Sequence, residues 1–134
     1  MTDVQIRSLP VPVRMKIARG ASRHLRSVLI RDTNAQVALS VLNGNNLPDS
    51  EVETIANSRA VVDEVLAEIP KKREWIRKYS IAKALVRNPK THLPIAIRLL
   101  PRMSLNDLRA LSRDRNIPEA VRSQARRLYH AKRR

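Results

Sequence analysis

Residues 76–97 read IRKYSIAKALVRNPKTHLPIAI. Apolar residues recur here at intervals of three and four and do not alternate, which is the pattern of a helix rather than of a strand. The pattern is interrupted at Asn88-Pro89, because the residue before a proline is disfavoured in helical conformation. The stretch therefore predicts a helix, a short turn and a second helix.

This unit of two helices recurs along the chain with a period of 28 residues. Three columns of residues keep the interval over four units: Arg31, Arg59, Arg87 and Arg115; Val37, Val65, Leu93 and Val121; Val41, Ile69, Ile97 and Ala125. A period of twice this length is also present, since Asp32 is matched by Asn88 and Val52 by Leu108. Fixed periods of this length are typical of repeat arrays.

The period predicts one domain over residues 1–134 with repeats near 9–34, 35–62, 63–90 and 91–128 and a basic tail at 129–134. Helices are expected near 10–19, 21–31, 35–43, 49–57, 61–69, 72–87, 91–100, 104–113 and 118–131. A pair of short helices cannot bury its apolar face alone, so neighbouring units must stack to make a continuous core. We therefore expect an all-α fold, a short right-handed αα superhelix of about four helical hairpins.

Two local features refine this prediction. Ser50 and Ser104 are expected to cap the helices that they open, because a serine hydroxyl accepts a hydrogen bond from the free N–H groups of the first turn. Trp75 and Tyr79 lie one turn apart in the expected helix 72–87. Their spacing with the apolar residues that follow predicts that both belong to the core.

The segment from residue 76 to residue 94 resembles the repeats of the bacterial leucine-rich repeat variant and of HEAT-like α-solenoids. Its residues VRNPKTHLP match the NP turn of those repeats and the helix that follows it, and a looser copy lies at 116–125. The resemblance covers about half of the chain and implies a HEAT-like solenoid. It does not fix a function, because such solenoids serve as scaffolds, as nucleic-acid binders and occasionally as enzymes.

The charge of the chain points to a negatively charged partner. Its 27 Lys and Arg against 12 Asp and Glu give a net charge of +15, and a surface this positive repels itself. Net charge is +5 over 1–45, −5 over 46–70, +8 over 71–100 and +7 over 101–134. Nucleic acid is the first expected partner, followed by an acidic protein; the acidic segment 49–68 could bind a separate partner.

The basic side chains gather in a few places. The candidate nucleic-acid-binding residues are Arg19, Arg23, Arg26, Arg31, Arg59, Lys71, Lys72, Arg73, Arg77, Lys78, Arg87, Arg115, Arg122, Arg126 and Arg127. The four arginines that share the 28-residue period have two interpretations. Each could bind the carbonyls at the end of a helix, or together they could form a ladder of charge along one edge of the superhelix. Stacked helices lie ~10 Å apart and phosphates ~3.4 Å apart along a strand, so one arginine would meet about every third phosphate.

Such a surface would hold phosphates without reading bases. The sequence has no helix-turn-helix spacing of the DNA-binding kind and only three aromatic residues, so neither groove readout nor base stacking is predicted. We expect nonspecific binding, to DNA in preference to RNA. The alternative is a protein-protein interaction scaffold for an acidic partner. A homodimer through the apolar first helix, with Leu9, Val11, Val13 and Ile17, is a further possibility.

The residue types needed for catalysis are scarce. There is no cysteine, the three histidines follow no metal-ligand spacing, and the two glycines, Gly20 and Gly44, form no phosphate-binding loop. We therefore expect no enzyme activity, no cofactor and no metal. No apolar run is long enough to cross a membrane and no signal peptide is visible, so we expect a cytoplasmic protein, associated with the nucleoid if it binds DNA.

Overall fold

The computed structural model describes residues 2–134, and this part of the chain is all-helical, with 70% helix and no strand. In chain order the α-helices are α1 (Asp3–Arg7), α2 (Val11–Ala18), α3 (Arg23–Leu29), α4 (Ala35–Asn43), α5 (Asp49–Asn57), α6 (Asp63–Glu68), α7 (Arg73–Ile76), α8 (Tyr79–Arg87), α9 (Leu93–Leu99), α10 (Leu105–Ser112) and α11 (Glu119–Arg133). Short 3-10 helices, η1 (Ile69–Lys71) and η2 (Leu100–Arg102), extend α6 and α9. The prediction of an all-α chain is confirmed.

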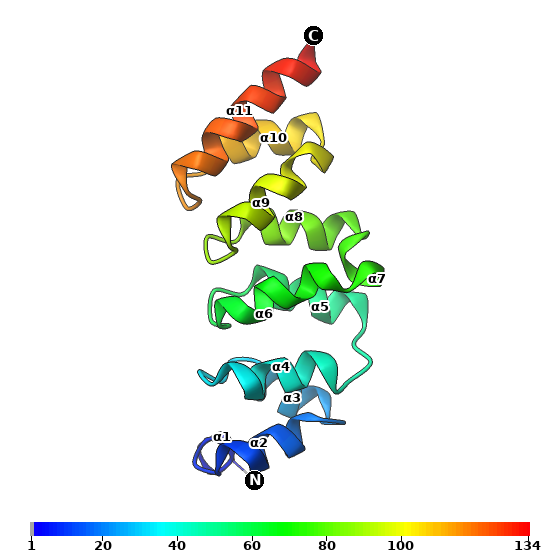
Figure 1. The fold of residues 1–134 in the computed structure, drawn as a ribbon, viewed down its shortest axis with the longest axis vertical. Coiled ribbons are helices and arrows are strands. Elements are labelled where there is room, and N and C mark those ends of the chain that lie inside the picture. The colour runs from blue at the N-terminus through cyan, green and yellow to red at the C-terminus, as the bar shows by residue number, and fades with distance from the viewer. Residues whose placement is uncertain (1) are drawn as a thin grey trace.

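The helices follow one another along the long axis of an elongated molecule (Figure 1). One set of contacts joins α2 to α4, α4 to α6, and α9 to α11, while α5 packs on α8. Helices adjacent in sequence also pack together, as α3 does on α4, α8 on α9 and α10 on α11. The chain therefore places alternate helices in two layers, and their apolar faces meet in one core that runs from Ile6 to Ala125.

The apolar column predicted by the 28-residue period is buried in the first, second and fourth units and exposed in the third. Val37, Val65 and Val121 are buried, whereas Leu93 is 42% exposed. The reason is that α9 begins at Leu93, two residues later than predicted, so that Ala96 instead faces the core.

Four loops share one hydrogen-bonded turn. In each loop a side-chain oxygen accepts the backbone N–H two residues ahead: Asp32 from Asn34, Ser58 from Ala60, Asn88 from Lys90 and Asp114 from Asn116, at 2.9–3.1 Å. Counted from the turn residue before it, Ser58 and Asp114 each come two residues earlier than a period of 28 requires, whereas Asn88 comes two residues later. The intervals between successive turn residues are thus alternately shorter and longer than 28 residues. Only the double period, from Asp32 to Asn88 and from Ser58 to Asp114, keeps the turn residues in register.

The predicted helix 72–87 is wrong, because the structure divides it into α7 and α8. The chain turns at Arg77 and Lys78, and Lys78 has extended backbone angles. Two carbonyls freed by this break, those of Ile76 and Arg77, accept hydrogen bonds from the guanidinium of Arg102 at 2.7 and 3.1 Å.

The break also separates the two aromatic residues expected in the core. Trp75 is buried, as predicted, but Tyr79 is 39% exposed, so its predicted place in the core is wrong. Among the predicted caps, Ser104 accepts the N–H of Asp107 and is confirmed. Ser50 is not a cap, because α5 begins one residue before it, at Asp49.

Candidate nucleic-acid interface

The four arginines of the 28-residue column lie on or directly before loops that share one edge of the molecule. The loops after α3, α5, α8 and α10 all lie on the left in Figure 1. Arg31, Arg59 and Arg115 belong to these loops, Arg87 is the last residue of α8, and all four side chains are exposed. We call these four residues the arginine edge.

The two interpretations of these arginines can now be compared residue by residue. Arg31 donates from Nε to the carbonyl of Ser27 at 3.2 Å, as expected of an arginine that caps a helix end. Among residues 2–134, the guanidinium groups of Arg59, Arg87 and Arg115 have no hydrogen bond or ion pair. Carbonyl capping therefore accounts for one member of the arginine edge, and the other three have exposed guanidinium groups without a bound partner in residues 2–134.

Two carboxylates near this edge are bound by other side chains. Asp32 accepts from Arg14 Nε at 2.9 Å, and Asp63 Oδ2 lies 2.7 Å from Nε2 of His92. The hydrogen bond to His92 is the main reason why the pKa of Asp63 is lowered from its ordinary value. These two carboxylates thus do not neutralise the arginine edge, whereas Asp114, on the loop of Arg115, lines one groove together with Arg87.

A second basic group lies on the opposite edge. Residues 71–78 surround α7, which lies on the right in Figure 1. Lys71 lies 3.3 Å from Glu68 and Lys78 lies 3.6 Å from Asp49. Lys72 sits over the ring of Trp75, with Nζ 5.7 Å from the centroid. The candidate residues are therefore not one continuous surface, since those of segment 71–78 and those of the arginine edge lie on two different sides.

Two candidate arginines, Arg26 and Arg122, are held by the protein itself. Arg26 donates to both oxygens of Glu51 at 2.9 Å and to the carbonyl of Ala21 at 2.8 Å. Hydrogen bonding to Glu51 raises the pKa of Arg26 above its ordinary value. Arg122 likewise binds Glu119 and the carbonyl of Ile117.

Arg14 makes the same pair of contacts, to Asp32 and to the carbonyl of Leu9. Arg14, Arg26 and Arg122 are each the fourth residue of a helix and reach the carbonyl five residues back. This arrangement fixes the chain where it enters α2, α3 and α11. We assign it to stability rather than to binding.

The remaining candidates are exposed. Arg23 keeps 83% of its side chain in solvent, 4.0 Å from Glu51. Arg19, Arg73, Arg77, Arg126 and Arg127 are exposed as well.

Sequence reasoning missed two residues on the loops of the arginine edge or next to it. Arg7 lies beside Arg31 in one surface depression. Arg113 directly precedes the turn residue Asp114, as Arg87 precedes Asn88. Arg113 could have been found by counting from the turn residues instead of along the period of 28, because it precedes Asp114 directly.

Comparison of the chain with protein-family models, with curated proteins and with solved structures finds no match to any of them. Within residues 2–134, no group of three or more His, Asp or Glu side chains could hold a metal ion. No helix in that range has both the length and the apolar character needed to cross a membrane.

Proposed function

We propose that this chain is a binding protein without catalytic activity that holds nucleic acid, DNA before RNA, by its phosphates along the arginine edge. One observation carries the proposal: three exposed guanidinium groups on one edge, those of Arg59, Arg87 and Arg115, have no partner within the described residues. Arginine is suited to this role because its planar group can bind a phosphate through two hydrogen bonds. A partner of this kind would place the protein in the cytoplasm, on the nucleoid if the nucleic acid is DNA.

The architecture that we propose is a short right-handed HEAT-like superhelix, as the resemblance to leucine-rich repeat variants implies. Its support comes from the two layers of alternating helices and from the turn that recurs at Asp32, Ser58, Asn88 and Asp114. In such a stack successive arginines are ~10 Å apart, close to the length of three phosphate steps along a strand. Contacts at this interval bind any sequence.

The experiment is a fluorescence-anisotropy titration with random duplex and single-stranded oligonucleotides over a range of salt. Each phosphate contact contributes roughly −0.9 to the slope of log K against log salt for duplex DNA. The variant Arg59→Gln/Arg87→Gln/Arg115→Gln should therefore make this slope less steep by about two to three units.

The matched control is Arg73→Gln/Arg77→Gln/Lys78→Gln, which removes the same charge from the opposite edge. It should leave most of the slope in place. Binding that ignores salt, or a control variant that loses as much slope as the arginine-edge variant, would refute the proposal.

The second candidate function is a scaffold for an acidic protein, and it is favoured by a groove between α3 and α5 whose arginines flank an apolar floor. Affinity purification before and after nuclease treatment separates the two functions, because a partner held through nucleic acid is lost on digestion.

Self-association is a third possibility: Val4 and Val13, at the N-terminal end, are 78% and 42% exposed. Sedimentation that shows only monomers would exclude it.

A further inference from the structure

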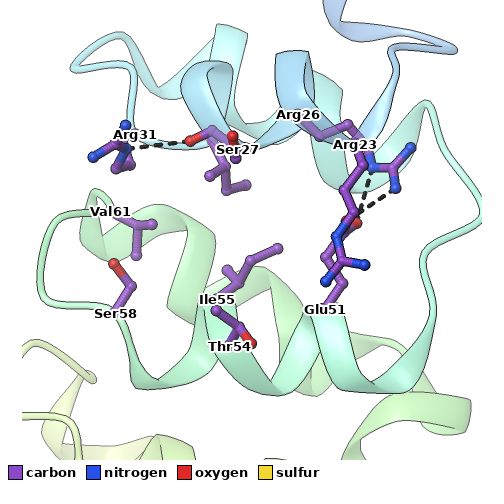
Figure 2. Close-up of a pocket in the computed structure, with 10 residues that line it drawn as sticks. Arg23, Arg26, Ser27, Arg31, Glu51, Thr54, Ile55, Ser58 and Val61 are labelled. Atoms are coloured by element: carbon purple, nitrogen blue, oxygen red, sulfur yellow. Dashed lines mark hydrogen bonds and ion pairs between the residues drawn. The ribbon is translucent and has the colours of Figure 1, made fainter.

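A groove lies between α3 and α5, and residues of both helices and of the loops that follow them line it (Figure 2). Its volume is about 250 Å³, and most of its surface is apolar. The apolar floor consists of Ile30, Ile55 and Val61, each at most 6% exposed. The hydroxyl-bearing side chains of Ser27, Thr54 and Ser58 also line it.

Positive charge stands at both ends of this groove. Arg31 lies at one end and Arg23 at the other, with Arg26 and Glu51 beside Arg23 (Figure 2). Arg26 and Glu51 neutralise each other through their two hydrogen bonds, so Arg23 and Arg31 supply the net charge. They are eight residues apart in the sequence. Ile30 and Arg31 continue the turn at the end of α3, so the two Cα atoms are about 12 Å apart at the rise of a helix.

A second groove, between α8 and α10, occupies the equivalent place two repeat periods later. Arg31 corresponds to Arg87, which lines this groove too. Its basic and acidic residues are equal in number, however: Lys83 and Arg87 are matched by Asp107 and Asp114, and Lys83 lies 3.1 Å from Asp107.

The substitutions between the two grooves explain the difference in charge. Ser58 in the first groove corresponds to Asp114 in the second, and Arg23 corresponds to Tyr79. The chain therefore contains two grooves from the same repeat, of which only the one between α3 and α5 is positively charged.

We propose that the groove between α3 and α5 binds an extended acidic peptide segment of a partner protein, with an aliphatic side chain between two carboxylates. In an extended peptide, residues i and i+4 are about 13 Å apart, which fits the separation of Arg23 and Arg31. Residue i+2 points to the same face as these two carboxylates. Its aliphatic side chain would pack on Ile30 and Ile55 while the carboxylates bind the two arginines.

The dimensions and the lining favour a peptide over other ligands. Small-molecule pockets usually measure about 300–1,000 Å³, whereas a cavity of about 150 Å³ already holds benzene, so this groove suits one or two aliphatic side chains. No aromatic residue lines it, and single-stranded nucleic acid is generally held by stacking of its bases on aromatic rings. The proposal deepens the second candidate function, the scaffold for an acidic protein, and does not rest on nucleic-acid binding, although Arg31 belongs to both surfaces.

The probe is the fluorescein-labelled peptide Gly-Glu-Ser-Leu-Ser-Glu-Gly, with capped termini, measured by anisotropy against the full chain. A first control peptide has Ser in place of Leu, and a second has Gln in place of each Glu. Both controls should bind at least about fivefold more weakly, because each removes one of the two kinds of contact. A Leu-to-Ser peptide that binds as well as the probe would show attraction by charge alone and would overturn the proposal.

The decisive variant is Ser58→Asp, which gives the first groove the carboxylate that Asp114 supplies in the second. The turn should survive, because Asp114 accepts the N–H of Asn116 as Ser58 accepts that of Ala60. Peptide affinity should fall about tenfold, the effect of one unfavourable charge contact. Ser80→Asp makes the same change of charge on the exposed start of α8, and affinity should stay within about twofold.

Chemical-shift mapping of the labelled protein identifies the groove that is occupied. Addition of the probe should perturb the amides of Ser27, Ile30, Thr54 and Ile55. Perturbations centred on α11 or on the groove between α8 and α10 would overturn the proposal, as would equal loss of affinity in Ser58→Asp and Ser80→Asp. A single-stranded oligonucleotide that perturbs the four amides more strongly than the peptide would identify the groove as a nucleic-acid site instead. Failure of the nucleic-acid titration would leave these results unaffected.

Discussion

The hydroxyl of Tyr79 donates a hydrogen bond to Oδ2 of Asp107 and thereby joins the start of α8 to α10. The same hydroxyl accepts the backbone N–H of Ser104 at 2.9 Å, and Nζ of Lys83 lies 3.1 Å from the other oxygen of Asp107. Burial opposes ionisation of Asp107, but these hydrogen bonds and the charge of Lys83 lower its pKa below the ordinary value. Tyr79, expected in the core, is thus an exposed link between two helices.

The substitution Tyr79→Phe should raise the pKa of Asp107 and lower the free energy of unfolding by about 0.5–1 kcal/mol near neutral pH. Because the pKa of Asp107 is lower in the folded than in the unfolded chain, its stabilising effect is complete above the ordinary value of 3.8 and is lost as pH falls through the folded value. The difference between variant and parent should therefore shrink in acid. Urea unfolding and carboxyl NMR titration measure the two effects. Tyr129→Phe is the control, and an unchanged Asp107 pKa in Tyr79→Phe would contradict the assignment.

Asn88 fastens one unit of the chain to the previous one. Its amide nitrogen donates to the carbonyls of Ala56 and Ser58 at 2.9 and 2.7 Å, and its oxygen closes the local turn to Lys90. Asn88→Ala leaves these groups without partners in a buried place, so the free energy of unfolding should fall by about 2–4 kcal/mol. Asn106→Ala, at an exposed position of α10, should change it by less than about 0.5 kcal/mol.

Asn88→Asp tests the direction of the two donated hydrogen bonds. A carboxylate at this position would face two carbonyl oxygens, which disfavours the charged form and raises its pKa in the folded chain. A raised pKa means that the variant is least destabilised below the ordinary aspartate value of about 3.9 and loses stability as pH rises through the folded value. Denaturant unfolding across this range checks the sign. Loss of stability toward acid would indicate that Asn88 is oriented the other way.

The two glycines should respond differently to substitution. Gly20 has φ of 72° and space for a Cβ atom, so only its left-handed backbone disfavours other residues. Gly44 has no such φ, but a Cβ there would lie 2.6 Å from the carbonyl oxygen of Ser40 and 2.7 Å from Cγ of Arg19.

At position 20, asparagine should be tolerated better than alanine, because asparagine adopts the left-handed conformation more readily. At position 44 the larger asparagine should be worse than alanine, and alanine should already cost about 1–3 kcal/mol. Thermal unfolding of the four single variants ranks alanine against asparagine at each position. If the same residue is the better tolerated one at both positions, a single cause governs both glycines.

The sequence predicts this fold best where its signals are local. Helices were expected at 35–43 and 49–57, and α4 and α5 have these bounds, because Asn34 caps the first and the loop at Gly44 separates them. The 28-residue period also indicated which four arginines lie at the loops on one edge of the molecule. What it could not predict is the alternation of shorter and longer intervals, which depends on where each turn residue lies.

Whether an arginine is bound by another residue of the protein was harder to predict than where it lies. Arg26 is bound by Glu51, which lies 25 residues away in the sequence, and no local pattern indicates such a pair. For Arg122 a local signal existed, since Glu119 precedes it by three residues, a spacing that favours ion pairs on a helix. Charge density alone therefore overestimates how many of the arginines are available to a partner.

Arg102, which follows the break between α7 and α8 by 25 residues, binds the carbonyls of Ile76 and Arg77. Arg102→Ala should leave these carbonyls to solvent and lower the free energy of unfolding by about 1 kcal/mol. It should also loosen α7, so hydrogen exchange at Trp75 should accelerate and its fluorescence, the only tryptophan signal of the chain, should shift toward that of an exposed ring. Arg102→Lys should recover part of the effect, because a lysine cannot reproduce the two-pronged geometry of a guanidinium. The control Arg98→Ala, at an exposed position of α9, should change neither the hydrogen exchange nor the fluorescence of Trp75. If Arg98→Ala and Arg102→Ala accelerate exchange at Trp75 alike, the break is maintained by the packing of Trp75 and not by Arg102.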